Sequence, residues 1–355
     1  MGSSSGDLLS LYFTAPRKVE LRPEILPETP PGQVLVETCC SAISPGTEML
    51  VYRGQFPRGG TRGGTAGTEV DETLSSLPGG FAYPLKYGYS AVGEVLELGA
   101  GVGGEWLGKR VFALQPHASH FISRTADLHP LPDGFEPEEA VFLPNMETAV
   151  NFAQDGAPLT GERVAVVGQG IVGLLTTALL SRFPLEQLVT FDRYLLRRQA
   201  SLSLGASASL DPAEAVPWSR GEVDLLEAAT TYGEFDLVYE LSGDPSALDL
   251  AIRLCGFGGR VVIGSWYGEK MAPVDLGGKF HRSRIQLIGS QVSTIAPSLS
   301  GRWDKPRRLG VAWEMLRKVK PASLITHTFP FEQAAEAYRL IDEHPEETVQ
   351  VVLTY

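Results

Sequence analysis

Cysteine is scarce in this chain, and its scarcity excludes two common ways of holding a small fold together. Three of the 355 residues are cysteines, namely Cys39, Cys40 and Cys255. Two of them are neighbours and the third lies far along the chain, so their spacing forms neither a disulfide framework nor a structural zinc motif. We therefore expect a protein of a reducing compartment, the cytoplasm.

Positive charge is also in short supply. The chain has 30 Lys and Arg residues against 42 Asp and Glu residues, a formal net charge of −12, which argues against extended contact with nucleic acid or anionic lipid. Two Arg-Gly-Gly units, at 58–60 and 62–64, are typical of RNA-binding segments, but no aromatic residue is interleaved with them. We expect no nucleic-acid partner.

The sequence also contains no run of apolar residues that is clearly long enough to cross a membrane. The most apolar stretch, 164–180, is marginal in length and contains Gly168, Gly170 and Gly173. A buried strand that turns into a buried helix explains the same pattern, and residues 1–6 carry no apolar signal-peptide region. We expect no membrane partner.

Two patterns of secondary structure divide the chain. Before about residue 120, short strands at 33–38, 91–98 and 110–113 are separated by Gly and Pro, which predicts a small barrel-like, antiparallel domain. From residue 160 onward strands and helices alternate, which predicts a doubly wound parallel sheet and an α/β fold class. The expected strands are 164–167, 188–191, 237–240, 260–263 and 286–289, and the expected helices are 171–183, 194–204 and 246–255. Helices at 306–318 and 331–342 and a strand at 348–353 follow, and we expect them to return to the first domain.

A glycine-rich turn carries the strongest motif. Gly168-Gln169-Gly170-Ile171-Val172-Gly173 follows an apolar strand and opens a helix, and Asp192 ends the next expected strand. These are the three conditions of a dinucleotide-binding fingerprint. Gly168 permits the tight turn, Gly170 lets the backbone approach a pyrophosphate, and Gly173 permits close packing of helix on strand. The free N–H groups of the first helical turn, at Ile171 and Val172, then face the pyrophosphate.

The residues after that second strand bear on which dinucleotide binds. Asp192 is expected to bind the ribose hydroxyls and to repel a 2′-phosphate, which favours NAD. Arg193 and Arg197 can instead stack on adenine or accept a 2′-phosphate, so NADP stays an alternative. A solvated helix face explains Arg197 and Arg198 equally well.

Several motifs together resemble those of the medium-chain dehydrogenase/reductase superfamily. They are Gly46-Thr47-Glu48, the segment from Tyr83 to Tyr89, Leu204-Gly205-Ala206 and the segment from Gly258 to Val262. The resemblance implies a GroES-like β-rich catalytic domain at 1–155, a Rossmann domain for NAD at 156–292, a return segment at 293–355 that completes the catalytic domain, and a homodimer. Locally, the Ser44–Glu48 and Gly88-Tyr89 segments resemble the bacteriochlorophyllide dehydrogenase branch.

The resemblance also extends the expected cofactor site beyond the fingerprint. It places a turn beside the nicotinamide ring and a second segment beside the carboxamide. The residues so implied are Ser242, Gly264, Ser265, Trp266, Ser290 and Gln291.

The zinc ligands of the superfamily are missing. Their positions correspond to Pro45, Tyr89 and, approximately, Pro144, and neither proline offers a ligand atom. We therefore expect no metal, and hydride transfer in which side chains replace zinc in stabilising the substrate oxygen.

Four residues are candidates for that chemistry. Thr47 matches the superfamily's hydroxyl that bonds substrate oxygen, and Tyr89 stands where a zinc-binding histidine is lost. His117 can act as a general acid or base near neutral pH, and Glu48 can orient Tyr89 or bind water. Structural roles are the alternative for each of them. Glu147, near the lost third ligand, is a weaker candidate.

These expectations together predict a zinc-independent, NAD(P)-dependent enzyme that interconverts an alcohol and a ketone or aldehyde on a mid-sized organic substrate. An enoyl reductase that saturates an α,β-unsaturated carbonyl or thioester is the alternative, because it needs the same oxygen polarisation. A non-catalytic NAD-binding sensor is a minor alternative.

Overall fold

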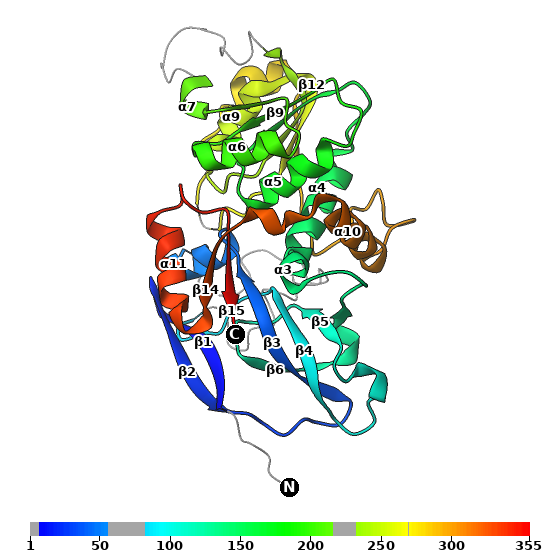
Figure 1. Ribbon diagram of the computed structural model, residues 1–355. Coiled ribbons are helices and arrows are strands. Elements are labelled where there is room, and N and C mark those ends of the chain that lie inside the picture. The colour runs from blue at the N-terminus through cyan, green and yellow to red at the C-terminus, as the bar shows by residue number, and fades with distance from the viewer. Residues whose placement is uncertain (1–6, 56–81, 216–231, 269) are drawn as a thin grey trace. The chain divides into compact units, whose positions relative to one another are not determined.

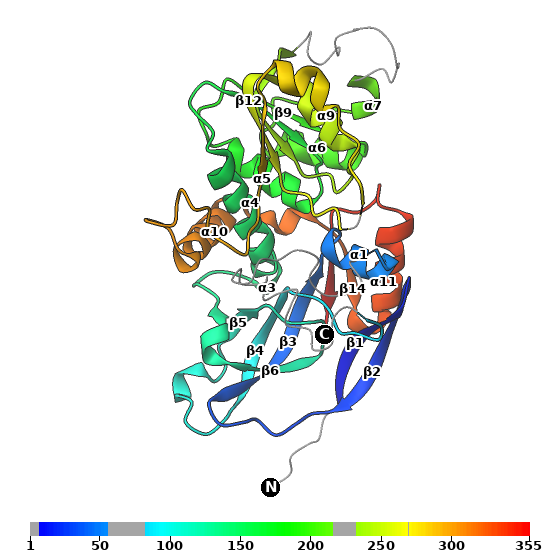
Figure 2. The same cartoon turned by 180° about the vertical axis from the view of Figure 1, so that it is seen from behind.

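The computed structural model describes residues 7–55, 82–215, 232–268 and 270–355, and it separates into two compact units (Figures 1 and 2). The first unit comprises Met1–Pro144 with Lys320–Tyr355, and the second comprises Asn145–Val319. The first unit is therefore discontinuous in sequence. The Arg-Gly-Gly units at 58–64 lie outside the described residues.

The unit boundaries differ from those expected at 155/156 and 292/293. Helix α4 (Leu143–Gly156) runs into the second unit, where its Phe152 packs in a core with Val164 and Leu237. Helix α10 (Lys305–Val319) also belongs there, because its buried Arg308 donates to Asn151 of α4 at 2.6 Å. These side-chain contacts extend the second unit at both ends.

The first unit is built on a seven-stranded sheet with the order β14-β15-β3-β4-β5-β7, in which β6 also pairs with β3. All pairs are antiparallel except β14 with β15. The strands are β3 (Gln33–Ile43), β4 (Ala91–Leu98), β5 (Arg110–Ala113), β6 (His120–Arg124), β7 (His129–Pro130), β14 (Ile325–Pro330) and β15 (Gln350–Thr354), with a separate hairpin of β1 (Asp7–Ala15) and β2 (Lys18–Ile25). The helices are α1 (Thr47–Arg53), α3 (Pro137–Ala140) and α11 (Ala334–Glu343), with short 3₁₀ turns at Gly104–Trp106, Thr125–Asp127, Pro321–Leu324 and Phe331–Gln333.

Strand β3 joins two apolar cores of this unit. Val34 and Val36, near its start, pack with β4 and β5 residues in one core. Ile43, at its end, packs in a second core with Met49 of α1 and Tyr338 of α11. The long strand thereby holds α1 against the sheet, and α1 begins at the candidate residue Thr47.

The second unit is a six-stranded parallel sheet with the order β10-β9-β8-β11-β12-β13. Its strands are β8 (Arg163–Val167), β9 (Gln187–Phe191), β10 (Ala208–Leu210), β11 (Phe235–Glu240), β12 (Cys255–Ile263) and β13 (Gln286–Gly289). Besides α4 and α10 its helices are α5 (Ile171–Leu180), α6 (Leu195–Ser203), α7 (Pro212–Ala215) and α9 (Ala247–Leu254), with a π turn at Leu276–Phe280. The strand order reverses between β8 and β11, which makes that position the topological switch point.

Helices cover both faces of this sheet. Val164 and Val166 of β8 pack with Leu180 of α5 on one face, whereas Ala165 and Val167 pack with α9 residues on the other. Burial on both faces explains why β8 is a continuous apolar run rather than an alternating one. The expected fold class, a GroES-like β-rich unit with a doubly wound parallel sheet, is confirmed. Among the described residues, no helix combines the length and the apolar character that crossing a bilayer requires.

Tyr239 of β11 yields a test of this packing. Its side chain is fully buried, and among the described residues its hydroxyl has no hydrogen-bond partner. The Tyr239→Phe change removes an unpaired buried polar atom and leaves the ring in place. We therefore expect the free energy of unfolding to rise by about 1 kcal/mol, measured by urea unfolding.

Tyr338→Phe is the matched control. Tyr338 is equally buried, but its hydroxyl donates to Glu48 at 2.5 Å, so its removal is expected to lower the free energy of unfolding by about 2 kcal/mol. A similar loss for Tyr239→Phe would mean that the Tyr239 hydroxyl is bonded, and would contradict the account of β11.

Candidate cofactor site and catalytic residues

The candidate residues fall into two groups, one in each unit. The expected cofactor residues lie in the second unit, and all but the helical ones lie in the segments that come after strands of the parallel sheet. Gly168 follows β8, Asp192 follows β9, Ser242 comes after β11, Gly264 follows β12 and Ser290 follows β13. The carboxyl edge of an open α/β sheet is where such folds bind ligands. The four catalytic candidates lie in the first unit.

The turn at Gly168 needs glycine for its own geometry. Gly168 has φ +93°, and a Cβ there would lie 2.5 Å from the Cα of Ser242. A Cβ on Gly173 would lie 2.0 Å from the carbonyl oxygen of Gly168. Both glycines are therefore required by the close packing of β8, α5 and the segment after β11, whether or not a ligand binds.

Gly170 differs from these two glycines. It is the residue before α5, its φ is −65°, and a Cβ there would meet nothing within 4 Å. The chain itself does not require glycine at this position. The open space adjoins the first turn of α5, where the N–H groups of Ile171, Val172 and Gly173 have no partner within the helix. An anion such as a pyrophosphate fits this arrangement.

Gln169 was not expected to matter, yet it ties the turn together. Its side chain is fully buried. The amide donates to the Gly168 carbonyl at 3.1 Å and accepts from the Thr177 hydroxyl of α5 at 2.9 Å. The middle residue of the glycine motif thus anchors the turn to its helix.

Asp192 is nearly buried, and both of its carboxylate oxygens bond to backbone. Oδ2 accepts from Gln169 N at 2.7 Å, and Oδ1 accepts from Tyr194 N at 2.8 Å. These bonds fix the carboxylate beside the Gly168 turn. Each oxygen still has acceptor capacity for a ribose hydroxyl.

The arginines after Asp192 have separate partners. Arg193 pairs with Asp244 at 3.3 Å, and both side chains are exposed. Arg197 lies 4.8 Å from the centre of the Tyr194 ring, and burial lowers the pKa of its guanidinium. Arg198 donates to the Asp192 carbonyl and to Asp211, both at 2.9 Å. Arg198 is therefore structural, whereas Arg193 and Arg197 remain beside the expected ribose position.

The residues after β12 and β13 have internal contacts of their own. A Cβ on Gly264 would lie 2.3 Å from the Phe152 ring, so packing against α4 requires this glycine. The Ser265 hydroxyl accepts from Gly243 N at 2.8 Å, which joins the segments after β11 and β12. The Trp266 side chain is 38% exposed.

Ser290 is held by α4. Its hydroxyl donates to the carboxylate of Asp155 and accepts from Asn151 at 2.9 Å. Burial raises the pKa of Asp155. Gln291 is exposed, and its side-chain oxygen accepts from Ser293 N at 3.0 Å.

The buried Arg308 organises the same region. It pairs with Glu147 at 2.9 Å and also donates to Asn151 and to the carbonyls of Val292 and Thr294. Glu147 therefore has a structural cation as its partner. The ion pair with Arg308 therefore favours a structural role for Glu147, the weaker of the catalytic candidates.

In the first unit, Tyr89 and Thr47 lie together. The Tyr89 hydroxyl donates to the hydroxyl of Ser44 at 2.6 Å, and it also shares a side-chain hydrogen bond with Thr47. Burial raises the pKa of Tyr89 to about 12, so its phenol stays protonated at neutral pH and can donate. Thr47 is partly exposed at the start of α1.

Glu48 and His117 occupy a different position from the one expected. Glu48 is fully buried, and its carboxylate accepts from Ser44 N at 2.9 Å, from His117 Nε2 at 2.9 Å and from the Tyr338 hydroxyl at 2.5 Å. It thus orients His117 rather than Tyr89. The other ring nitrogen of His117 bonds to the Ser41 hydroxyl at 2.7 Å.

These contacts favour the structural alternative for His117 over a role as general acid or base. The ring is fully buried, both nitrogens are occupied, and a Cβ on Gly88 would lie 2.8 Å from it. Glu48, its partner, is buried as well. A buried histidine in a loop has the same sequence signature as an exposed one, so the residue pattern could not decide between them.

Three segments that the resemblance assigns to zinc ligands come together without a ligand set. Tyr89 bonds to Ser44, which precedes Pro45, and the neighbouring Ser90 donates to the Val141 carbonyl at 2.6 Å. Pro45 and Pro144 have no donor atom for a metal. The donor atoms at this place do not fit a zinc ion.

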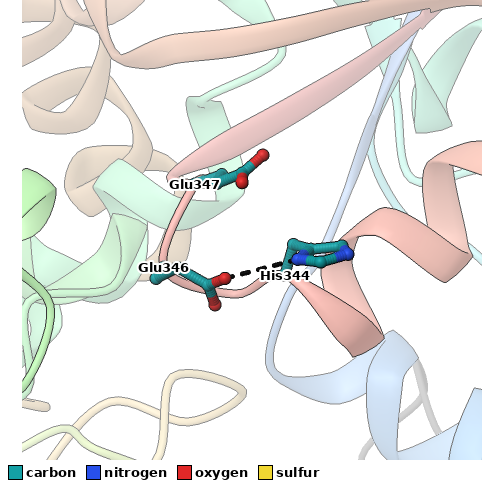
Figure 3. Close-up of side chains that lie close together, drawn as sticks. All are labelled: His344, Glu346 and Glu347. Carbon is teal, nitrogen blue, oxygen red and sulfur yellow. Dashed lines mark hydrogen bonds and ion pairs between the residues drawn. The ribbon is translucent and has the colours of Figure 1, made fainter.

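A possible ligand group occurs elsewhere on the first unit. Within the described ranges, His344, Glu346 and Glu347 alone bring three ligand atoms within 4.8 Å of one another. All three are exposed on the turn after α11, where His344 and Glu346 lie 3.3 Å apart (Figure 3). The group contains none of the candidate residues.

Comparison with known proteins supports the fold. No protein-family profile matches the chain. It is 26% identical over 351 residues to 2-desacetyl-2-hydroxyethyl bacteriochlorophyllide A dehydrogenase of Cereibacter sphaeroides, covering 95% of each chain. It is 24% identical over 279 residues to D-guloside 3-dehydrogenase of Escherichia coli K12, covering 76% of this chain and 78% of the relative.

Two solved structures cover almost the whole chain. The alcohol dehydrogenase RspB of Escherichia coli CFT073, in complex with NADH, superposes with a TM-score of 0.75 at 19% identity over 99% of this chain and 100% of its own. A zinc-binding dehydrogenase of Sinorhizobium meliloti 1021, bound to NADP, gives 0.73 at 17% identity over 99% and 100%. The chain has the medium-chain dehydrogenase/reductase fold. Relatives of zinc type are among the matches, so the fold alone does not predict zinc-independence.

Proposed function

We propose that this protein is an NAD(P)-dependent oxidoreductase that interconverts an alcohol and a ketone or aldehyde without a catalytic zinc ion. The observation that carries the proposal is the open space at Gly170, next to the first turn of α5, with the Asp192 carboxylate fixed beside it. The relatives named above are dehydrogenases of a guloside and of a hydroxyethyl-bearing pigment, which favours alcohol chemistry over enoyl reduction. The cytoplasmic location and the homodimer belong to the same proposal.

The residues of the second unit fit a nicotinamide dinucleotide. Gly170 leaves room for a pyrophosphate, and the α5 N–H groups supply donors for it. The immobile Asp192 carboxylate favours an unsubstituted ribose and hence NAD, while the exposed Arg193 keeps NADP possible. When bound, the nicotinamide supplies or accepts the hydride.

In the first unit, hydroxyl groups stand in for the missing metal. Negative charge develops on the substrate oxygen as hydride reaches a carbonyl carbon, and preorganised donors stabilise it. The side chains of Thr47 and Tyr89 are joined by a hydrogen bond, and the Tyr89 phenol remains protonated at neutral pH. We assign the polarisation of the substrate oxygen to this pair. Glu48 accepts from the backbone N–H of Ser44, whose hydroxyl accepts from Tyr89, and His117 bonds to Glu48 and to Ser41.

The glycine turn gives the first test. Gly170→Ala introduces a Cβ into open space at an ordinary φ, so the melting temperature is expected to stay within about 2 °C. The same methyl group would occupy the place assigned to the pyrophosphate. We expect the Kd for NADH, measured by fluorescence titration, to rise about tenfold or more.

Gly168→Ala provides the contrast. Its Cβ would meet Ser242 at a φ of +93°, so this variant is expected to lose about 2 kcal/mol or more of stability. Unchanged NADH affinity in a stable Gly170→Ala protein would contradict the proposed pyrophosphate position.

The position of the transferred hydride tests the reaction itself. With NADH deuterated at C4 and a panel of α,β-unsaturated aldehydes and ketones, we expect deuterium on the carbon that bears oxygen. Thr47→Val and Tyr89→Phe are expected to lower kcat about 100-fold each, because each removes a donor to that oxygen. NMR and mass spectrometry locate the label.

Tyr12→Phe is the control for the tyrosine variant, because its hydroxyl bonds to Glu24 in the β1–β2 hairpin. It is expected to leave kcat unchanged. Deuterium on the β-carbon with an intact carbonyl would identify an enoyl reductase. Tight NADH binding with no labelled product on a broad panel would favour the sensor.

A further inference from the structure

A buried carboxylate lies at the switch point of the parallel sheet. Glu240 is the last residue of β11, and it pairs in register with Val167 of β8 on one side and Ile263 of β12 on the other. Gly168 and Gly264 directly follow these two partners, and they begin the turns at the carboxyl edge of the sheet. Its side chain is fully buried.

The contacts of this carboxylate join the turns around it. Oε1 accepts from the backbone N–H of Ser242 at 2.8 Å and from the hydroxyl of the same residue, and Oε2 accepts from the Tyr267 hydroxyl. Ser242 in turn lies against Gly168, because a Cβ there would be 2.5 Å from the Ser242 Cα. Glu240 thus fixes the turns after β8, β11 and β12 relative to one another.

These partners leave the charge of Glu240 uncompensated. Among the described residues, every group that bonds to the carboxylate is neutral. The nearby charged side chains bond elsewhere: Arg193 pairs with Asp244, and Lys270 donates to the Gly243 carbonyl at 3.3 Å. The side chains of Arg193, Asp244 and Lys270 are all exposed to solvent, and screening by solvent and salt weakens their electrostatic effect on Glu240. Burial, and next to it the Glu240 carboxylate, raise the pKa of Tyr267.

A buried anion without a cationic partner is costly, and a neutral glutamine could keep both bonds from Ser242 on its single oxygen. A glutamate at this edge of the sheet therefore suggests that its negative charge interacts with a positively charged part of a ligand. Ligands of such folds bind outside the carboxyl ends of the strands at the switch point. A nicotinamide ring is cationic when oxidised and neutral when reduced. The phosphate charges of the dinucleotide are the same in both forms, so their repulsion cancels in a comparison of the two.

We propose that the buried Glu240 carboxylate biases this site toward the oxidised form of its nicotinamide cofactor. The inference rests on the proposed function and adds to it an electrostatic role for a residue that does not touch the reacting atoms. Glu240 is in this sense a positioning residue, because it fixes the turns and sets the field that the cofactor meets.

Binding of the two redox forms separates this role from a merely structural one. The Kd values for NAD⁺ and NADH are measured by calorimetry for the full-length wild type, Glu240→Gln and Glu240→Asp. Glu240→Gln removes the charge, so it is expected to weaken NAD⁺ binding about threefold to tenfold more than NADH binding. Glu240→Asp keeps the charge, so it is expected to preserve the ratio of the two Kd values even where both rise.

Tyr267→Phe gives an effect of opposite sign. It removes a donor that offsets the carboxylate charge, so the affinity for NAD⁺ is expected to rise about twofold relative to that for NADH. This variant decides the question by itself if Glu240→Gln fails to fold, because a structural defect would weaken both forms alike.

Equal weakening of NAD⁺ and NADH binding in Glu240→Gln, or an unchanged ratio in Tyr267→Phe, would overturn the inference and leave the proposed function intact. If the wild-type protein binds neither NAD⁺ nor NADH, and neither NADP⁺ nor NADPH, the proposed function itself fails.

Discussion

The close approach of Gly168 to Ser242 is the constraint on which the carboxyl edge of the parallel sheet depends. No residue with a Cβ fits at Gly168, and the backbone of Ser242 fills the space instead. Glu240 holds Ser242 in that place, and Asp192 holds the amide of Gln169 from the other side. These contacts hold the turn in one arrangement, and preorganisation of this kind lowers the entropy cost of binding a ligand. The turn itself does not need glycine at position 170, because a Cβ there would meet nothing within 4 Å.

In the first unit, a hydrogen-bond network lies beside the positions that the superfamily resemblance assigns to zinc ligands. Glu48 is buried and accepts three hydrogen bonds, and one of its donors is His117. The carboxylate and the imidazole are both buried and bond to each other. Ser44 links this buried pair to Tyr89, and Tyr89 itself bonds to Thr47. The polar chemistry that remains accessible is that of hydroxyl groups, which suits stabilisation of a substrate oxygen by hydrogen bonding.

Local pattern was sufficient to predict the parallel sheet, its glycine turn and Asp192, because those features depend on residues adjacent in sequence. The β1–β2 hairpin was not among the expected strands, although Lys18-Val19-Glu20-Leu21 at the start of β2 alternates polar and apolar residues. The burial of His117 was missed because its partners Ser41, Glu48 and Tyr338 are distant in sequence. Arg308 displaced the expected domain boundaries for the same reason, as it bonds to α4 about 160 residues earlier. One signal was available and unused: Glu240 is a charged residue that ends an apolar strand at the carboxyl edge, where such folds bind ligands.

We propose that hydride transfer proceeds here without zinc, and metal analysis coupled to an activity assay separates this mechanism from zinc catalysis. The purified protein is dialysed against a strong chelator, its zinc content is measured by mass spectrometry, and NAD(P)H-dependent carbonyl reduction is assayed before and after. The account predicts full activity at a zinc content far below one ion per chain. Activity that disappears with the zinc and returns in proportion to added Zn²⁺ would contradict the zinc-independent mechanism. It would also require zinc ligands at positions other than 45 and 144.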